Sequence, residues 1–186
     1  LRLTDEAVKE RAKSQAQQEL LIAELNHRVR NILNLIRGLI NQSKHEAGTI
    51  EEFSDIVGGR ISSLAAAHDN ITKGNWSAAP LSELIDTEAH AYLSRQKDRL
   101  RVTGPEAMVS PEAYTVLALV IHEMITNSAK YGSLSDSSGH LDIAITRNSD
   151  NSLQIDWKES GGPPVKPPTR RGFGSTIIER SIPFEL

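Results

Sequence analysis

The sequence predicts an α+β chain in two parts, an N-terminal antiparallel helical hairpin followed by an α/β sandwich. First, apolar residues recur at alternating spacings of three and four through a long stretch with very little Gly and no Pro. Second, beyond residue 76 short segments of alternating apolar residues are mixed with amphipathic helices, which is typical of a sheet covered by helices. The boundary is expected near residues 73–80, where Gly74 and Pro80 interrupt the helical pattern.

The composition excludes several classes of function. The 186 residues carry a formal charge of −3, so no overall basic field supports nucleic-acid binding or a polybasic membrane anchor. No apolar run approaches the roughly 20 residues that cross a bilayer. The chain has no cysteine, which excludes disulfides and thiolate chemistry. We expect a cytoplasmic protein without membrane or nucleic-acid partners, whose chemistry uses His, Asp, Glu, Asn and Lys.

The first helix is predicted over residues 5–42, where an apolar seam of the coiled-coil type runs along one side. The seam consists of Ile22, Leu25, Val29, Ile32, Ile36 and Leu39. Residues 1–19 continue the helix with a more polar pattern, as expected of a connector from another domain that this sequence does not contain.

A second amphipathic helix is predicted to begin after Thr49, a suitable N-cap, with Glu51 and Glu52 in its first turn. Its apolar positions are Phe53, Val57, Ile61, Leu64 and Ile71. The two helices would form a hairpin domain over residues 20–75. Each seam is wider than one hairpin can cover, so we expect two hairpins to pair as a four-helix bundle in a homodimer.

The second part, residues 76–186, is predicted to alternate helices with short strands. Helices are expected at 81–94 and 111–130, and strands at 100–103, 141–146 and 152–157. The polar turn between the last two strands makes them a hairpin. Each of these strands alternates apolar and polar residues, so one face of the sheet can be covered by the helices.

One predicted helix carries a candidate phosphate and metal face. Glu123, Asn127 and Lys130 fall within roughly 60° of each other at about 100° per residue. A carboxylate, an amide oxygen and an ammonium group suit a hydrated Mg²⁺ ion that bridges phosphates. A solvated polar face is the alternative. His122 and Glu123 do not begin a zinc-protease motif, because Thr126 occupies the position of its second histidine.

The chain after the last strand offers a candidate nucleotide loop. Glu159 ends this strand and is followed by Gly161 and Gly162, so its carboxylate could accept from an exocyclic amine such as that of adenine. Gly172 and Gly174 precede a short helical run whose backbone N–H groups could hold phosphate. A simple loop is the alternative. The sequence has no P-loop, Rossmann or Ser/Thr-kinase motif, so those nucleotide folds are excluded.

His27 lies on the first predicted helix at a position that faces water. A neutral imidazole is a good phosphoryl acceptor, although most exposed helical histidines are inert. Asn31 follows one helical turn later and could position a water molecule. Arg28, directly after His27, leaves no acidic base adjacent in sequence.

Four ordered segments together resemble the HWE group of sensor histidine kinases. They are ELNHRVRNIL at 24–33, HEMITNSAKYGSLS at 122–135, WKESGGP at 157–163 and GFGS at 172–175. The resemblance covers residues 20–182. It implies a dimerisation and histidine-phosphotransfer hairpin followed by the ATP-binding sandwich shared with gyrase-type ATPases. That family usually continues with a final strand hairpin beyond the point where this sequence ends, so we expect an incomplete sheet.

The resemblance also implies roles for the residues of the first helix and of the Asn-containing segment. His27 would be the phosphoacceptor and Asn127 the Mg²⁺ ligand. Glu123 would be a catalytic carboxylate or a further metal-site group, and Lys130 would contact phosphate. Asn31 would position water for dephosphorylation of a partner, by analogy with a similarly placed polar residue in other kinase families.

The same resemblance implies that Glu159 recognises adenine, that His122 lies with the nucleotide-binding residues, and that four glycines shape the nucleotide lid and phosphate loops. These glycines are Gly161, Gly162, Gly172 and Gly174. The expected cofactors are ATP and Mg²⁺. The expected partners are the receiver domain of a response regulator, a second copy of the chain, and an upstream sensory domain of PAS, LOV or phytochrome type.

Two rival functions remain open. The first is a Ser/Thr kinase or an energy-transducing ATPase of the same ATP-binding fold, and the helix that presents His27 argues against both. The second is a degenerate kinase that serves as a dimeric scaffold, which the intact Asn127, Glu159 and glycine motifs disfavour.

Overall fold

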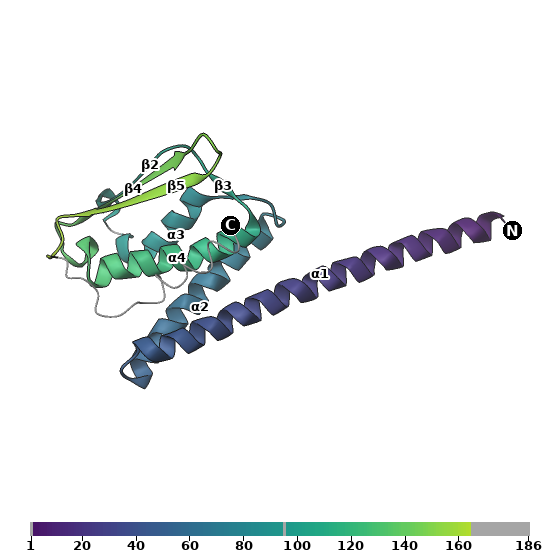
Figure 1. Cartoon of the computed structure of the whole chain (residues 1–186), viewed down its shortest axis with the longest axis horizontal. Helices are drawn as coiled ribbons and strands as arrows, with labels where there is room; N and C mark the ends of the chain where they lie inside the picture. The colour runs from purple at the N-terminus through teal and green to yellow at the C-terminus, as the bar shows by residue number, and fades with distance from the viewer. Residues whose placement is uncertain (1, 95, 165–186) are drawn as a thin grey trace. The chain divides into compact units, whose positions relative to one another are not determined.

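The computed structural model describes residues 2–94 and 96–164 of the chain (Figure 1). By their contacts the residues divide into two compact units, 1–45 and 46–186, which are described separately. The α+β class predicted from the sequence is confirmed. Within the described ranges no helix is long and apolar enough to cross a membrane.

The first unit consists of α1 (Arg2–Glu46) without its last residue, Glu46, which belongs to the second unit; the long helix predicted there is confirmed. The helix carries an exposed apolar side. Three members of the predicted seam, Ile22, Leu25 and Val29, are exposed to 57%, 60% and 46% in the single chain. A contiguous apolar stripe of this kind on a helix is typical of a surface that another helix covers.

The second unit begins with α2 (Ile50–Lys73), whose start confirms the predicted cap. The hydroxyl of Thr49 accepts from the Glu52 N–H at 3.1 Å, and the Glu52 carboxylate accepts from the Gly48 N–H at 2.8 Å. Both bonds satisfy N–H groups that lack a partner within the helix. The helix ends at Gly74, and Asn75 and Trp76 follow with φ of 53° and 58°.

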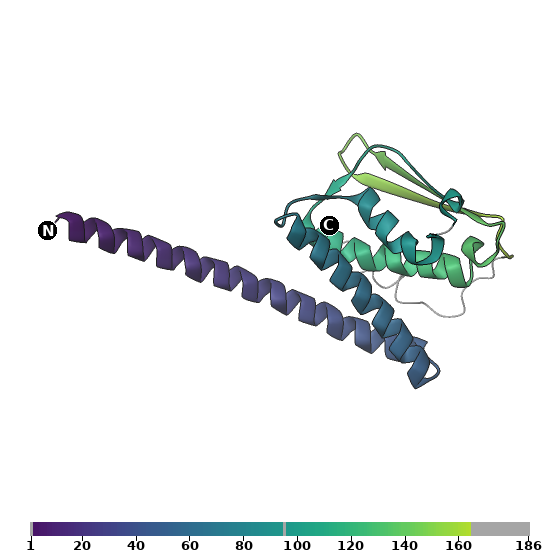
Figure 2. The ribbon, with the colours of Figure 1, turned by 180° about the vertical axis from the view of Figure 1, so that it is seen from behind.

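The remaining elements form a sheet with helices on one face, as both views show (Figures 1 and 2). The helices are α3 (Leu81–Leu93) and α4 (Pro111–Lys130), and the latter has the bounds predicted from the sequence. The hydroxyl of Ser110 caps α4 by accepting from the Ala113 N–H, and Pro111 occupies its first turn. Short 3-10 turns lie at Lys97–Arg99 (η1) and Ser133–Ser135 (η2).

The main sheet has the order β2-β4-β5, and its strands are β2 (Leu100–Thr103), β4 (His140–Arg147) and β5 (Leu153–Ser160). β2 runs parallel to β4, and β4 runs antiparallel to β5. The predicted hairpin is confirmed, and β5 extends three residues beyond its predicted end at residue 157. A pair of two-residue strands, β1 (Ala79–Pro80) and β3 (Met108–Val109), was not predicted.

The core lies between the sheet and the helices. Leu141, Ile143 and Ile145 of β4 are 0–3% exposed and belong to one cluster with apolar residues of α2, α3 and α4. The register opposes Leu141 to Glu159 and Ile143 to Trp157. Since side chains alternate along a strand, Trp157 and Glu159 therefore lie on the helix-covered face of β5.

Candidate functional site

Glu159 lies where the end of β5 meets the end of α4, and its carboxylate is held by three donors of the second unit. The Ser128 hydroxyl donates to Oε1 at 2.5 Å, and the Trp157 indole N–H donates to the same oxygen at 3.2 Å. The Ser133 backbone N–H donates to Oε2 at 2.6 Å. These donors come from α4, β5 and η2, so the position of the carboxylate is set by three separate elements.

The electrostatics of this carboxylate favour its ionised form. Burial raises the pKa of the Glu159 carboxyl, but the hydrogen bonds from Ser128, Ser133 and Trp157 outweigh burial and hold this pKa below its usual value. A carboxylate offers about four acceptor positions, of which these donors occupy three. One position therefore remains for a further donor, and the residue as a whole is exposed. The arrangement fits the exocyclic amine of an adenine.

Glycines allow the backbone to pass close to this carboxylate. A Cβ atom at Gly132 would lie 2.0 Å from Oε2 of Glu159, so any side chain at residue 132 would displace the carboxylate. After β5, Gly161 adopts a φ of 73°, and a Cβ at Gly162 would lie 2.5 Å from the Cα of Ser133. Gly161 and Gly162 thus let the chain after β5 approach the segment that holds Glu159.

A buried arginine fixes the segment from Ser133 to Gly139. The guanidinium of Arg99, which is 8% exposed, donates to the Gly139 carbonyl at 2.8 Å and to the Ser133 carbonyl at 3.3 Å. It also donates to the carbonyl of Asp136. Arg99 therefore supports the turn from which the Ser133 N–H reaches Glu159.

Asn127 and Lys130 lie beside this site at the end of α4, and both are exposed. The Asn127 carbonyl accepts from the N–H groups of Tyr131 and Gly132, which closes the helix next to Glu159. Ser128, whose hydroxyl contacts Glu159, directly follows Asn127. The structure thus brings Asn127, Lys130 and Glu159 to one end of the domain, where the Asn127 amide oxygen is available to a hydrated cation.

Glu123 and His122 are instead engaged with α2 and α3. Both oxygens of Glu123 accept from the Arg60 guanidinium, at 2.6 and 2.9 Å, and Glu123 is buried. His122 Nδ1 lies 2.9 Å from Oε2 of Glu88. Among residues 2–94 and 96–164, no group of three or more His, Cys, Asp or Glu could hold a metal ion. A Mg²⁺ ion that used the Glu123 carboxylate would have to share it with the Arg60 guanidinium or displace that group.

His27 and Asn31 lie on α1, in the first unit. Both are exposed, and Asn31 Nδ2 is 3.5 Å from His27 Nδ1, at the outer limit of a hydrogen bond. Arg28 pairs with Glu24 one turn earlier, so the basic residue beside His27 is neutralised within the helix. Gly172, Gly174 and the helical run after them lie outside the described residues.

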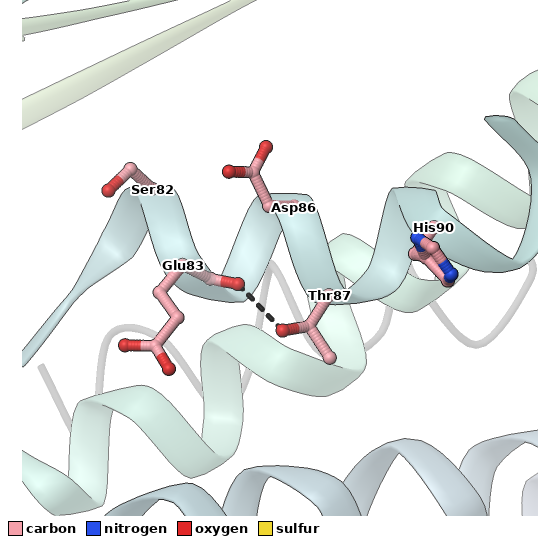
Figure 3. Close-up of a pocket in the computed structure, with 5 residues that line it drawn as sticks. All are labelled: Ser82, Glu83, Asp86, Thr87 and His90. Carbon is pink, nitrogen blue, oxygen red and sulfur yellow. Dashed lines mark hydrogen bonds between the residues drawn. The ribbon is translucent and has the colours of Figure 1, made fainter. Parts of the chain in front are cut away.

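A groove lies along α3, but its lining does not suit catalysis. Its walls are formed by side chains of this one helix: Ser82, Glu83, Asp86, Thr87 and His90 (Figure 3). The hydrogen bond drawn among them runs from the Thr87 hydroxyl to the Glu83 carbonyl within the helix. A binding site needs polar groups that converge from several elements, as they do at Glu159.

Several residues of the site were not predicted. The segment 122–135, which the sequence analysis identified as a motif, contains Ser128, Gly132 and Ser133. Their role beside Glu159 depends on β5, a strand that lies elsewhere in the sequence. Gly132 could have been flagged, because a glycine directly after a predicted helix indicates a close approach or a turn. No local sequence pattern indicated the contacts that Arg60 and Arg99 make.

Comparisons with known proteins agree with these features. A family model described as HWE histidine kinase matches residues 24–106. A blue-light-activated histidine kinase of Brucella anthropi is 31% identical over 182 residues, which are 96% of this chain and 37% of that protein. One of Brucella ovis is 30% identical over the same length. The chain thus spans little more than a third of the curated relatives that it matches.

Two solved structures share the fold. The blue-light activated histidine kinase of Erythrobacter litoralis EL346 superposes with a TM-score of 0.58 at 19% identity and covers 87% of this chain and 55% of that chain. The separate histidine kinase domain of the same protein gives a TM-score of 0.55 and covers 82% of this chain and 73% of that one.

Proposed function

Because the chain belongs to the HWE family of histidine kinases, we propose that it binds ATP and transfers the γ-phosphoryl group to its own His27. The observation that carries this proposal is the carboxylate of Glu159. It is held ionised by three donors with one acceptor position left, next to the exposed Asn127 and Lys130. That combination suits an adenine amine at one end of the nucleotide and phosphates at the other.

In the proposed reaction each of these residues has a separate role. Glu159 accepts from the adenine amine, and Lys130 contacts phosphate. Asn127 would hold Mg²⁺, which supplies charge neutralisation of the phosphates when it is bound. A ring nitrogen of His27 forms a bond to the γ-phosphorus while the bond from that phosphorus to the bridging oxygen breaks, so ADP leaves and the imidazole loses its proton.

The first test is incubation of the chain with Mg²⁺ and γ-labelled ATP. We expect label that is stable to base and labile to acid, as a phosphohistidine is, and its loss in His27→Ala. His45→Ala is the matched control, because His45 is also exposed and lies on the same helix. Label that survives in His27→Ala would remove His27 from the mechanism. Nucleotide binding without any label would favour a scaffold.

We further propose that the phosphoryl group passes to an aspartate of a response regulator receiver domain, and that Asn31 positions water for the later hydrolysis of that phospho-aspartate, which releases inorganic phosphate. The exposure of Asn31 one turn after His27 supports this role. Asn31→Ala is expected to keep autophosphorylation and to lose dephosphorylation of the phosphorylated receiver. Loss of both activities would refute the assignment.

The proposed assembly is a homodimer through α1. The exposed apolar seam at Ile22, Leu25 and Val29 supports pairing, since burial of such a stripe is favourable. Leu25→Glu should convert a dimer to a monomer in analytical ultracentrifugation, whereas Glu19→Lys should not. A wild-type monomer at micromolar concentration would contradict the dimer.

For the whole protein we propose three parts: a connector over 1–19 that leads from a sensory domain, a phosphotransfer domain over 20–75, and the ATP-binding domain over 76–186. The names of the relatives favour a light-responsive sensory domain of the PAS, LOV or phytochrome type. The cytoplasm is the compartment we propose, because the reaction requires ATP.

A further inference from the structure

The α4 residues His122 and Glu123 contact α2 through a buried polar network, which we call the α2 latch. It consists of Arg60, Ser63, Glu88, His122 and Glu123. Arg60 is 2% exposed, and Ser63, Glu88 and Glu123 are also buried. The α2 and α4 helices lie against each other here, as Figure 1 also shows.

The latch joins three helices by short hydrogen bonds. Arg60 Nε and one terminal nitrogen bind the two oxygens of Glu123, at 2.6 and 2.9 Å. The Ser63 hydroxyl donates to Glu88 at 2.5 Å, and the other oxygen of Glu88 faces His122 Nδ1. A Cβ atom at Gly59 would lie 3.3 Å from His122 Nε2, so the glycine permits this close approach of α2 to α4.

Arg60 also binds Glu46, at 2.7 Å, so its guanidinium bridges two carboxylates. Burial lowers the pKa of Arg60, but the hydrogen bonds and charges of Glu123 and Glu46 outweigh burial and keep this pKa above its usual value. The guanidinium is therefore charged under all working conditions. A fixed positive charge within hydrogen-bond distance of Glu123 disfavours a second cation on that carboxylate.

We propose that Arg60 is a positioning residue which holds Glu123 on α2, and that Arg60 and a magnesium-bound nucleotide compete for this carboxylate. The inference rests on the proposed function, to which it adds that Glu123 serves the ATP site. Both oxygens of Glu123 accept from Arg60, and the fixed charge of Arg60 beside them disfavours a cation on the same carboxylate, so binding of one partner weakens binding of the other. By linkage, each partner weakens the binding of the other by the same factor.

The test measures binding of Mg²⁺ with AMP-PNP, a non-hydrolysable ATP analogue, by calorimetry on the 186-residue chain. Arg60→Met removes the competing cation and keeps the length of the side chain. We expect it to bind Mg²⁺ and AMP-PNP about tenfold more tightly, within the usual range of such couplings. Glu46→Gln is the matched control: it removes the charge of the other carboxylate that binds Arg60 and should change the affinity by less than about twofold.

A second measurement follows the Nε–H resonance of Arg60 by NMR in the wild-type chain, assigned through the bonded side-chain and backbone nuclei of Arg60. Mg²⁺ with AMP-PNP should shift this resonance and speed its exchange with water, whereas AMP-PNP with a chelator should leave it unchanged. This readout holds even if Arg60→Met folds poorly, and it requires no phosphoryl transfer.

The outcomes separate the two proposals. Binding of Mg²⁺ and AMP-PNP with an unchanged Arg60 resonance, or with equal affinities in wild type and a folded Arg60→Met, would overturn the competition and leave the kinase proposal standing. Absence of nucleotide binding in both chains would overturn both. Binding only in Arg60→Met would support the competition.

Discussion

The indole N–H of Trp157 donates to Oε1 of Glu159 at 3.2 Å, between two residues on the same face of β5. Because side chains two residues apart in a strand point the same way, the Trp-x-Glu spacing is what allows this bond. The Trp157 side chain also packs on the core, so apolar contacts fix the position of the indole ring. The ring in turn orients the Glu159 carboxylate through this hydrogen bond. The proposed recognition of the nucleotide by Glu159 is thereby linked to packing of the core.

Glu159→Gln is predicted to weaken binding of Mg²⁺ and AMP-PNP by about tenfold or more, because a hydrogen bond to a charged acceptor contributes about 1.5–3 kcal/mol. Calorimetry would measure the change. Asp156→Asn is the control, since Asp156 lies on the opposite, exposed face of β5 and accepts only from Gln154 among the bonds resolved for it. Equal weakening by both substitutions would show that the effect is general and that Glu159 does not recognise adenine.

Stability should depend on pH through the same carboxyl. Hydrogen bonds hold the folded-state pKa of Glu159 below its ordinary value of 4.5, so the carboxylate stabilises the fold above that value. The stabilisation should be lost as the pH falls through the lower, folded-state pKa. The difference in free energy of unfolding between wild type and Glu159→Gln should therefore narrow as the pH falls below 4.5.

Urea unfolding at a series of pH values would measure this dependence. Ser128→Ala is the informative companion, because it removes one of the donors that lower the pKa of Glu159 and should make the dependence shallower. A difference between wild type and Glu159→Gln that stays constant across the range would contradict the assigned pKa direction.

The sequence predicted the helices and strands that are determined by neighbouring residues in the chain. The bounds of α4 follow from the Ser110 cap, Pro111 and the apolar period, and the β4–β5 hairpin follows from alternation and a polar turn. Glu159 was selected as a candidate because a strand end followed by glycines is a local signal. Periodicity identifies an apolar face but not the element that covers it, so dimerisation of α1 stays a prediction.

The contacts that escaped prediction join residues far apart in the chain. Arg60 lies 63 residues from Glu123, and its charge alone indicates a solvated position. It is nevertheless on the face of α2 that also buries Leu64 and Ala67. Only a partner carboxylate on another helix makes burial of that charge acceptable, and no pattern within α2 reveals the partner.

Arg99→Met should destabilise the second unit by about 2–4 kcal/mol, because it leaves the carbonyls of Ser133, Asp136 and Gly139 without this donor. It should also weaken AMP-PNP binding, since the Ser133 N–H that holds Glu159 belongs to the same turn. Arg101→Met is the control. Arg101 is exposed and lies 3.8 Å from Asp142, so its loss should change stability by less than about 0.5 kcal/mol. Similar unfolding midpoints for the two variants would contradict the role of Arg99.

Two glycine-to-alanine substitutions should have opposite effects. Gly58→Ala, inside α2, meets no atom within 4 Å and should stabilise the chain by about 0.5–1 kcal/mol, because alanine restricts the unfolded backbone and favours helix. Gly132→Ala would place Cβ 2.0 Å from Oε2 of Glu159 and 2.9 Å from the Cα of Ser128. Gly132→Ala should lower the free energy of unfolding by about 1–3 kcal/mol, and it should also weaken AMP-PNP binding. Thermal unfolding and calorimetry on both variants would measure this. A Gly132→Ala chain with wild-type nucleotide affinity would mean that Glu159 can move without consequence, which would remove it from the nucleotide site.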